Sequence, residues 1–206
     1  MGVKVAKFGG SSLADADHIR KVQAIVQSDP ERRYVVPSAP GKRDAGDRKI
    51  TDLLYLCHTH VQQDVPFEEV YALIEERYLD IVHDLGLDLD LRPQLSDVKK
   101  QIAGGATADY TASRGEYLNG IIMAKLLGYE FVDPAQIIFF DEHGRLDADR
   151  TQEETSRRLG RHRHAVIPGF FGTMKDGSIK TFSRGGSDIT GAIVARGGGA
   201  EIYENW

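Results

Sequence analysis

The first forty residues alternate between two patterns, and this alternation restricts the fold more than any other feature of the chain. Residues 3–8 (VKVAKF) are typical of a short strand, which runs into a Gly-Gly loop. Residues 13–29 repeat apolar positions at the spacing of one helical face, and residues 32–41 (RRYVVPSAPG) indicate a second strand that ends in a turn-rich loop. Because short connections between a strand, a helix and a strand place the two strands parallel, the sequence predicts an α/β fold with a mostly parallel sheet.

Helical periodicity dominates the middle of the chain. Residues 50–103 hold three helical segments, separated by a proline and by the run LDLDLRP. Another helix is predicted over residues 115–128, where a glycine is typical of the helix end, and a last one over residues 187–196. The basic run RRLGRHRH, residues 157–164, follows two glutamates and indicates a solvated helix end rather than a nucleic-acid site.

Further strands are predicted in the second half of the chain. Two of them contain Gly turns typical of hairpins, at His143-Gly144 and Asp176-Gly177. The predicted strand regions are residues 129–133, 135–148, 164–183 and 200–206. No internal repeat and no linker interrupts this pattern, so we expect one domain over residues 1–206.

Composition narrows the class of protein. Of the 206 residues, 41% are hydrophobic and 28% are charged, which is ordinary for a soluble globular protein. The net charge of -5 argues against nucleic acid as the main partner, and no apolar stretch reaches the length needed to cross a membrane. The single cysteine, Cys57, excludes an intrachain disulfide and fits a reducing compartment, so we expect a cytoplasmic protein. Cys57 with His60, and His162 with His164, fall short of the ligand count of a zinc site, and no metal site is predicted.

The first glycine loop, KFGGSS, has the features of an anion site. Lys7 stands at a strand end, and Gly9 and Gly10 let backbone N–H groups approach an anion closely. The lysine adds a point charge suited to a phosphate. The alternative is a tight turn in which Lys7 only packs its aliphatic stem. The loop is not a P-loop, because the sequence contains no G-x-x-x-x-G-K-[ST].

A second glycine loop, SRGGSD at residues 183–188, again precedes a predicted helix, whose N-terminus favours negative groups. Ser187 or Asp188 is a candidate for the cap of that helix. Arg184 can bind a carboxylate or phosphate through two parallel hydrogen bonds. An aspartate in an anion site needs a cation, so Asp188 indicates either a partner such as Lys7 or a magnesium-dependent site. The alternative for Asp188 is simple compensation of the helix dipole.

Two further segments carry candidate ligands for a small molecule. Glu116, in YTASRGEYLNG, follows a glycine at a predicted helix start. If it faces the same pocket as Arg184, the pair offers a carboxylate for an ammonium group and a guanidinium for a carboxylate, which describes a free amino acid. Ser38 and Thr51 bracket a polar loop and offer short hydroxyl donors, although Thr51 also suits an ordinary helix cap.

Four motifs occur in one order: KFGGSS, then SAP with ITDLL, then SRGE, then GFFG with SRGGSD. Together they resemble the aspartate kinases of the amino-acid kinase family, from residue 3 to the last residue. The resemblance implies a three-layer α/β/α sandwich, with ATP on one side of a cleft and the phosphate acceptor on the other. It also implies ATP-dependent phosphorylation of the L-aspartate side chain to 4-phospho-L-aspartate, the first step toward lysine, threonine and methionine.

The same resemblance implies roles for single residues. Lys7 would contact the transferring phosphoryl group, and Asp188 would organise that lysine and the reacting groups. The phosphates of ATP, as its Mg²⁺ complex, would be bound by Lys7, Gly9, Gly10, Ser11, Gly185 and Gly186. The aspartate pocket would be lined by Ser38, Thr51, Glu116, Phe170, Arg184 and Ser187, with Glu116 on the ammonium group and Arg184 on the α-carboxylate. A side-chain carboxylate with a pKa of ~4 is ionised at neutral pH and needs no general base. This agrees with a site made of Lys, Arg, Gly and helix termini, in which no histidine takes part.

Members of that family continue beyond the last strand, with a Thr-Asp segment of the nucleotide pocket and then regulatory ACT domains. A closing strand at residues 200–206 would also lie in a sheet whose covering layer is missing. We therefore expect residues 1–206 to be an incomplete catalytic domain whose intact form is a homo-oligomer. The loop Pro40–Lys49 is longer and more polar than in many members, and the sequence gives it no partner.

Two other functions compete with this hypothesis. One is another kinase of the same superfamily, acting on glutamate, acetylglutamate, carbamate or a nucleotide. The other is a non-catalytic amino-acid-binding fragment. The motifs SRGE and RGGSD favour aspartate, because they supply ligands for an ammonium group and for a carboxylate.

Overall fold

The computed structural model describes residues 2–183 and 185–206. Its centre is a five-stranded sheet in the order β3-β4-β2-β1-β7, and every pair of neighbours in it is parallel. The strands are β1 (Lys4–Phe8), β2 (Arg32–Pro37), β3 (Glu130–Phe131), β4 (Ala165–Val166) and β7 (Ile202–Asn205). The predicted parallel α/β sheet is therefore confirmed.

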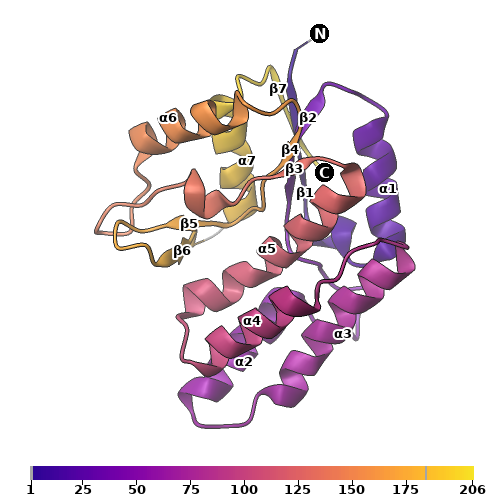
Figure 1. Cartoon of the computed structure of the whole chain (residues 1–206), viewed down its shortest axis with the longest axis vertical. Helices are drawn as coiled ribbons and strands as arrows, with labels where there is room; N and C mark the ends of the chain where they lie inside the picture. Colours follow the sequence, from indigo (N-terminus) through magenta and orange to yellow (C-terminus); the bar gives the residue numbers. More distant parts are fainter. Residues whose placement is uncertain (1, 184) are drawn as a thin grey trace.

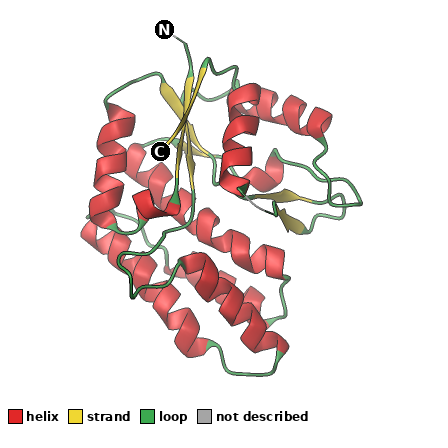
Figure 2. Cartoon of the chain, turned by 180° about the vertical axis from the view of Figure 1, so that it is seen from behind, coloured by secondary structure: helices red, strands yellow, loops and turns green. Residues whose placement is uncertain are grey.

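Helices cover both faces of this sheet. Figure 1 shows α6 and α7 on one side and α1 on the other, with α2 to α5 continuing that second layer downward; Figure 2 shows the sheet between the same two layers from behind. The helices are α1 (Ala16–Gln27), α2 (Ile50–Gln62), α3 (Glu68–Asp84), α4 (Arg92–Ala103), α5 (Ala108–Leu127), α6 (Ala148–Leu159) and α7 (Gly186–Gly197). The three-layer α/β/α arrangement agrees with the prediction.

The alternation along β1 explains the two layers. Val5 packs into the core that includes α6 and α7, whereas Ala6 and Phe8 pack into the larger core formed with α1 to α5. Because successive side chains of a strand point to opposite faces, Lys7 lies on the same face as Val5, toward α7. The strand pattern thus determines which helix layer can approach the lysine.

A small antiparallel hairpin, β5 (Phe171–Thr173) and β6 (Ile179–Thr181), confirms the turn predicted at Asp176-Gly177. The strand predicted over residues 135–148 is wrong in extent. The structure has a short 3₁₀ helix, Pro134–Gln136, and isolated bridges at Phe139 and Phe140. The turn predicted at His143-Gly144 is confirmed: Phe140 and Leu146 form an antiparallel bridge across it, and the side chain of Asp141 accepts hydrogen bonds from the backbone N–H groups at 143 and 145.

Helix α5 begins seven residues earlier than predicted. Thr107 caps it by accepting the backbone N–H of Tyr110 at 3.1 Å. The sequence predicts a helix boundary at Gly115, but this residue lies inside α5. A Cβ there would lie 2.8 Å from the Cβ of Ala39, which explains why the position is a glycine. Glu116 is therefore an interior residue of α5, and the prediction that it stands at a helix start is wrong.

Candidate functional site

Lys7 and Asp188 form an ion pair across the α7 face of the sheet. The Lys7 Nζ lies 2.8 Å from Asp188 Oδ1 and donates a hydrogen bond to Asn205 Oδ1 at 3.1 Å. Strand register brings Asn205 beside the lysine, because Lys7 and Asn205 pair across β1 and β7. The lysine side chain is 12% exposed and the aspartate side chain 50%, so the lysine is largely buried whereas the carboxylate is half exposed to solvent. The predicted pairing of Asp188 with Lys7 is therefore present in the structure.

The start of α7 leaves Asp188 available for that pair. The N-cap is Gly185, in the left-handed region at φ 58°, and no side chain caps the helix. The prediction that Ser187 or Asp188 serves as the cap is therefore wrong. A Cβ on Gly185 would lie 3.7 Å from Asp188 Oδ2, so glycine keeps the space beside the carboxylate open as well as allowing the turn. Arg184, the predicted carboxylate ligand, lies outside the described residues.

The first glycine loop is packed closely against the second strand's loop. The Gly41 N–H donates to the Gly10 carbonyl at 2.8 Å, and a Cβ on Gly10 would lie 2.9 Å from the carbonyl oxygen of Ala39. Gly9 donates its own N–H to the carbonyl of Trp206 at 3.0 Å. The backbone N–H of Gly9, a predicted phosphate ligand, is therefore engaged in this structure.

A cavity of about 440 Å³ opens beside this loop. Its volume suits a small-molecule ligand. It is lined by Gly10, Ser11, Ser38, Ala39, Pro40, Gly41, Lys42, Lys49, Thr51 and Glu116. The structure thus brings together five residues that sequence reasoning chose separately: Gly10, Ser11, Ser38, Thr51 and Glu116. Thr51 does not cap α2, whose N-cap is Lys49, so the alternative role considered for this threonine is excluded.

Glu116 is the carboxylate of this cavity, and it is 5% exposed. Burial raises its pKa to about 7, and the N–H of Ala39 and the charge of Arg114 only partly oppose that effect. Among the described residues, no group hydrogen-bonds to its Oε2. A buried carboxylate that borders a cavity and has one oxygen without a partner among the described residues is suited to an ammonium group, which would supply both the charge and the missing donor.

One face of α5 fixes the loop opposite Glu116. Asn119 lies one turn further along the helix and donates its Nδ2 to the carbonyl of Ser38 at 2.7 Å. The hydroxyl of Tyr78, on α3, donates to the carbonyl of Gly115 in α5 at 2.7 Å. Sequence reasoning missed Asn119, although its spacing of three from Glu116 is the signal that would have found it.

Phe170 and Ser187, two predicted pocket residues, lie at the α7 side and are not among the described residues that line the cavity. Phe170 has the left-handed φ of 86°, held by a hydrogen bond from its N–H to Thr190 Oγ1 at 3.1 Å. A Cβ on Gly186 would come within 2.5 Å of the Phe170 ring, which explains the second glycine of SRGGSD as a packing requirement. The candidates therefore form two groups, one at the cavity and one around α7.

Over residues 2–183 and 185–206, no cluster of three or more His, Cys, Asp or Glu side chains is arranged to hold a metal ion. Over the same residues, no helix combines the length and the apolar character of a membrane span.

Comparison with known proteins gives one consistent family. The profile of the amino acid kinase family matches residues 2–206. The chain is 38% identical to Aspartokinase 3 of Bacillus subtilis, over 99% of this chain and 48% of that protein. It is 27% identical to the lysine-sensitive aspartokinase 3 of Escherichia coli, over 99% of this chain and 48% of that protein.

Two solved structures have the same fold. The crystal structure of Clostridium acetobutylicum aspartate kinase superposes with a TM-score of 0.97 at 52% identity, covering 100% of this chain and 48% of that one. Escherichia coli aspartokinase III in complex with aspartate and ADP superposes with a TM-score of 0.83 at 25% identity, covering 99% and 48%. The chain spans about half the length of the relatives it matches.

Proposed function

The chain belongs to the amino acid kinase family, and from this membership we propose that its protein phosphorylates the side-chain carboxylate of L-aspartate with ATP to give 4-phospho-L-aspartate. The relatives named above support aspartate as the acceptor, since they are aspartate kinases and one of them was solved with aspartate and ADP. The observation that carries the proposal is the Lys7–Asp188 ion pair. Its lysine lies three residues before Gly10, which lines the cavity that holds Glu116.

The proposed roles follow the two groups of the site. Glu116 binds the substrate ammonium group, and the hydroxyls of Ser38 and Thr51 face the acceptor. Lys7 binds the transferring phosphoryl group, and Asp188 holds the lysine in place through the 2.8 Å contact. Arg184 remains the sequence-based candidate for the α-carboxylate, and Phe170, Ser187 and the glycines 9, 10, 185 and 186 keep their proposed places around the substrates.

This arrangement is suited to phosphoryl transfer without a general base. The side-chain carboxylate of aspartate has a pKa near ~3.9 and is already a nucleophile at neutral pH. One of its oxygens forms a bond to the γ-phosphorus as the bond to the β,γ-bridging oxygen breaks and ADP departs. Lys7 lowers the barrier by neutralising charge on the phosphoryl oxygens. Mg²⁺ enters this scheme as part of the nucleotide substrate, in which phosphate oxygens and water molecules are ligands of the ion.

The proposal extends to the setting of the enzyme. It places the reaction at the entry to lysine, threonine and methionine synthesis, in the cytoplasm, with a homo-oligomer as the intact form. Cys57 is buried and free, and burial raises its pKa to about 12, so the thiol is protonated and unreactive at neutral pH.

The direct test measures product as well as nucleotide. The full-length protein is incubated with Mg-ATP, aspartate and hydroxylamine, which traps an acyl phosphate as a hydroxamate. Equal yields of ADP and aspartyl hydroxamate are expected. Parallel reactions replace aspartate by glutamate, N-acetylglutamate, carbamate or a nucleoside monophosphate. Faster turnover of one of these acceptors would contradict aspartate as the substrate, and calorimetric binding of aspartate without ADP release would indicate a binding module.

A further inference from the structure

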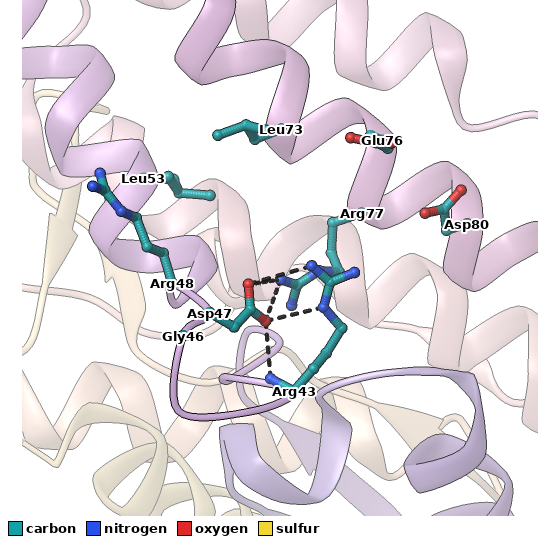
Figure 3. Close-up of a pocket in the computed structure, with 9 residues that line it drawn as sticks. All are labelled: Arg43, Gly46, Asp47, Arg48, Leu53, Leu73, Glu76, Arg77 and Asp80. Atoms are coloured by element: carbon teal, nitrogen blue, oxygen red, sulfur yellow. Dashed lines mark hydrogen bonds and ion pairs between the residues drawn. The ribbon is translucent and has the colours of Figure 1, made fainter.

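The Pro40–Lys49 loop, whose partners the sequence did not reveal, separates two cavities. One face of the loop contributes Lys42 and Lys49 to the 440 Å³ cavity that holds Glu116. Its other face lines a second cavity of about 300 Å³ against α3, shown in Figure 3. In that view Asp47 points from the loop toward Arg77 of α3, with Arg43 closing over the same carboxylate.

Arg77 binds the loop at two points. Its Nη2 donates to both carboxylate oxygens of Asp47, at 2.6 and 2.5 Å, and its Nη1 donates to the carbonyl of Gly41 at 3.1 Å. The arginine side chain is 4% exposed and that of Asp47 is 11% exposed. Burial acts to raise the pKa of Asp47, but hydrogen bonds from Arg43 and the charge of Arg77 hold it well below its usual range. The carboxylate is therefore ionised, and this buried contact is an ion pair in which one guanidinium nitrogen contacts both carboxylate oxygens.

Each of the two anchor points lies just before one of the lysines in the sequence. Lys42 directly follows Gly41, whose carbonyl Arg77 holds, and Lys49 comes two residues after Asp47. Both lysines are exposed. Lys49 is the N-cap of α2, whereas Lys42 stands within the loop and would sample many positions if the loop were free. A buried ion pair contributes little net stability, because desolvation offsets much of the Coulomb attraction. The main physical consequence of this one is that it fixes where the loop stands over the cavity.

The charges that line the Glu116 cavity match a substrate with an ammonium group and a side-chain carboxylate. Lys42 and Lys49 are the cationic side chains among the described residues that line it, and Glu116 is the anionic one. With Glu116 assigned to the ammonium group, the side-chain carboxylate is left to the lysines. A lysine ammonium is a compact point charge on a flexible stem, so it depends on its backbone for position.

We propose, building on the function above, that Lys42 and Lys49 bind the side-chain carboxylate of the acceptor and thereby select a dicarboxylic amino acid. Arg77 acts as a positioning residue: through Asp47 and the Gly41 carbonyl it holds the loop so that both lysines reach the cavity.

The first experiment compares aspartate with asparagine, which keeps the ammonium group and the α-carboxylate but has a neutral amide of the same shape. Calorimetry on the full-length protein gives both dissociation constants for wild type and for Lys42→Gln/Lys49→Gln. The double variant should bind aspartate about tenfold more weakly, the effect of losing a charged hydrogen bond, and asparagine less than about twofold more weakly. ATP affinity should not change. Lys175→Gln, an exposed lysine in the β5–β6 turn, is the matched control.

The second experiment tests the positioning role by coupling. Asp47→Asn keeps the shape of the side chain but removes its charge, and it should weaken aspartate binding about tenfold in the wild-type background. In the Lys42→Gln/Lys49→Gln background the same change should add less than about twofold, because residues acting through one another are not additive. Full additivity would overturn the positioning role, since a merely structural defect weakens binding whether or not the lysines are present.

The two proposals fail in different ways. If the wild-type protein phosphorylates aspartate and the double lysine variant keeps the wild-type ratio of aspartate to asparagine affinity, the inference about the lysines is wrong and the proposed function stands. If wild type neither binds nor phosphorylates aspartate, both are wrong.

Discussion

Aspartate affinity should depend on pH through Glu116, the buried carboxylate of α5. Burial raises its pKa from the usual 4.5 to about 7, so near neutral pH the empty site holds a mixture of the neutral and charged forms. Only the charged form attracts an ammonium group. Because the side-chain carboxylate of aspartate stays ionised above a pH of ~5, titration of the ligand does not obscure that of the site. Affinity should therefore rise with pH until Glu116 is fully ionised.

The expected size follows from the titration of one group. Relative to the plateau above about pH 8, the dissociation constant for aspartate should be about tenfold larger at pH 6 and about 100-fold larger at pH 5. Binding near pH 6 to 7 should also release a proton, which calorimetry in buffers of different ionisation enthalpy detects. Glu116→Gln should bind aspartate weakly at every pH, with no proton release.

The raised pKa of Glu116 should also make the unfolding free energy depend on pH, but in the opposite direction to aspartate affinity. A folded-state pKa above the unfolded value stabilises the protein below pH 4.5, and the contribution is lost as pH rises through about 7. The unfolding free energy of wild type should therefore fall by about 3 kcal/mol relative to Glu116→Gln across that window. A flat pH profile of aspartate affinity between pH 5 and 8, with no proton release, would refute the assignment of the ammonium group to Glu116.

Three further substitutions test other parts of the site. Lys7→Ala should lower turnover about 10²–10³-fold in a steady-state ADP-release assay, the usual effect of removing one donor to developing charge, and an unchanged rate would exclude the lysine from the chemistry. Gly10→Ala places a Cβ 2.9 Å from the carbonyl oxygen of Ala39; the loop must shift, so aspartate affinity and melting temperature should both fall, and wild-type values for both would show that the close packing is unimportant. Tyr78→Phe removes the 2.7 Å hydrogen bond to the Gly115 carbonyl and should cost about 1 kcal/mol in urea denaturation, with no change in ATP affinity. A stability loss below the error of that measurement would contradict a role for this bond in fixing α5.

Local pattern predicted the elements well because it reports short-range physics. The alternation VKVAKF specifies a strand whose Val5 and Lys7 share a face, and the structure places both toward α7. The pairing of the lysine with Asp188 was one of three interpretations, beside a magnesium-dependent site and compensation of the helix dipole, and it follows from the need of a carboxylate in an anion site for a cation. Ser38 and Thr51 line the same cavity because they lie at the two ends of the connection between β2 and α2.

Local pattern misled where packing overrides propensity. A glycine in a polar run was interpreted as a helix boundary, yet Gly115 is the point where α5 approaches Ala39 closely enough to exclude a side chain. That approach buries Glu116 and sets its pKa, which no feature of the surrounding residues indicates. The strand predicted over residues 135–148 is too long, because the segment begins with a 3₁₀ helix and pairs across its turn only through the isolated Phe140–Leu146 bridge.

The sequence by itself determined the α/β class with its parallel sheet, the two glycine loops and the residue types of the site, because each depends on spacing along a few turns of chain. Only the tertiary structure decided which of these residues meet. Lys7 reaches Asn205 across 198 positions, and Arg77 reaches the loop at Asp47 from another helix. Such contacts depend on how whole helices and strands pack, and that packing is set by the sum of many buried side chains rather than by any local run.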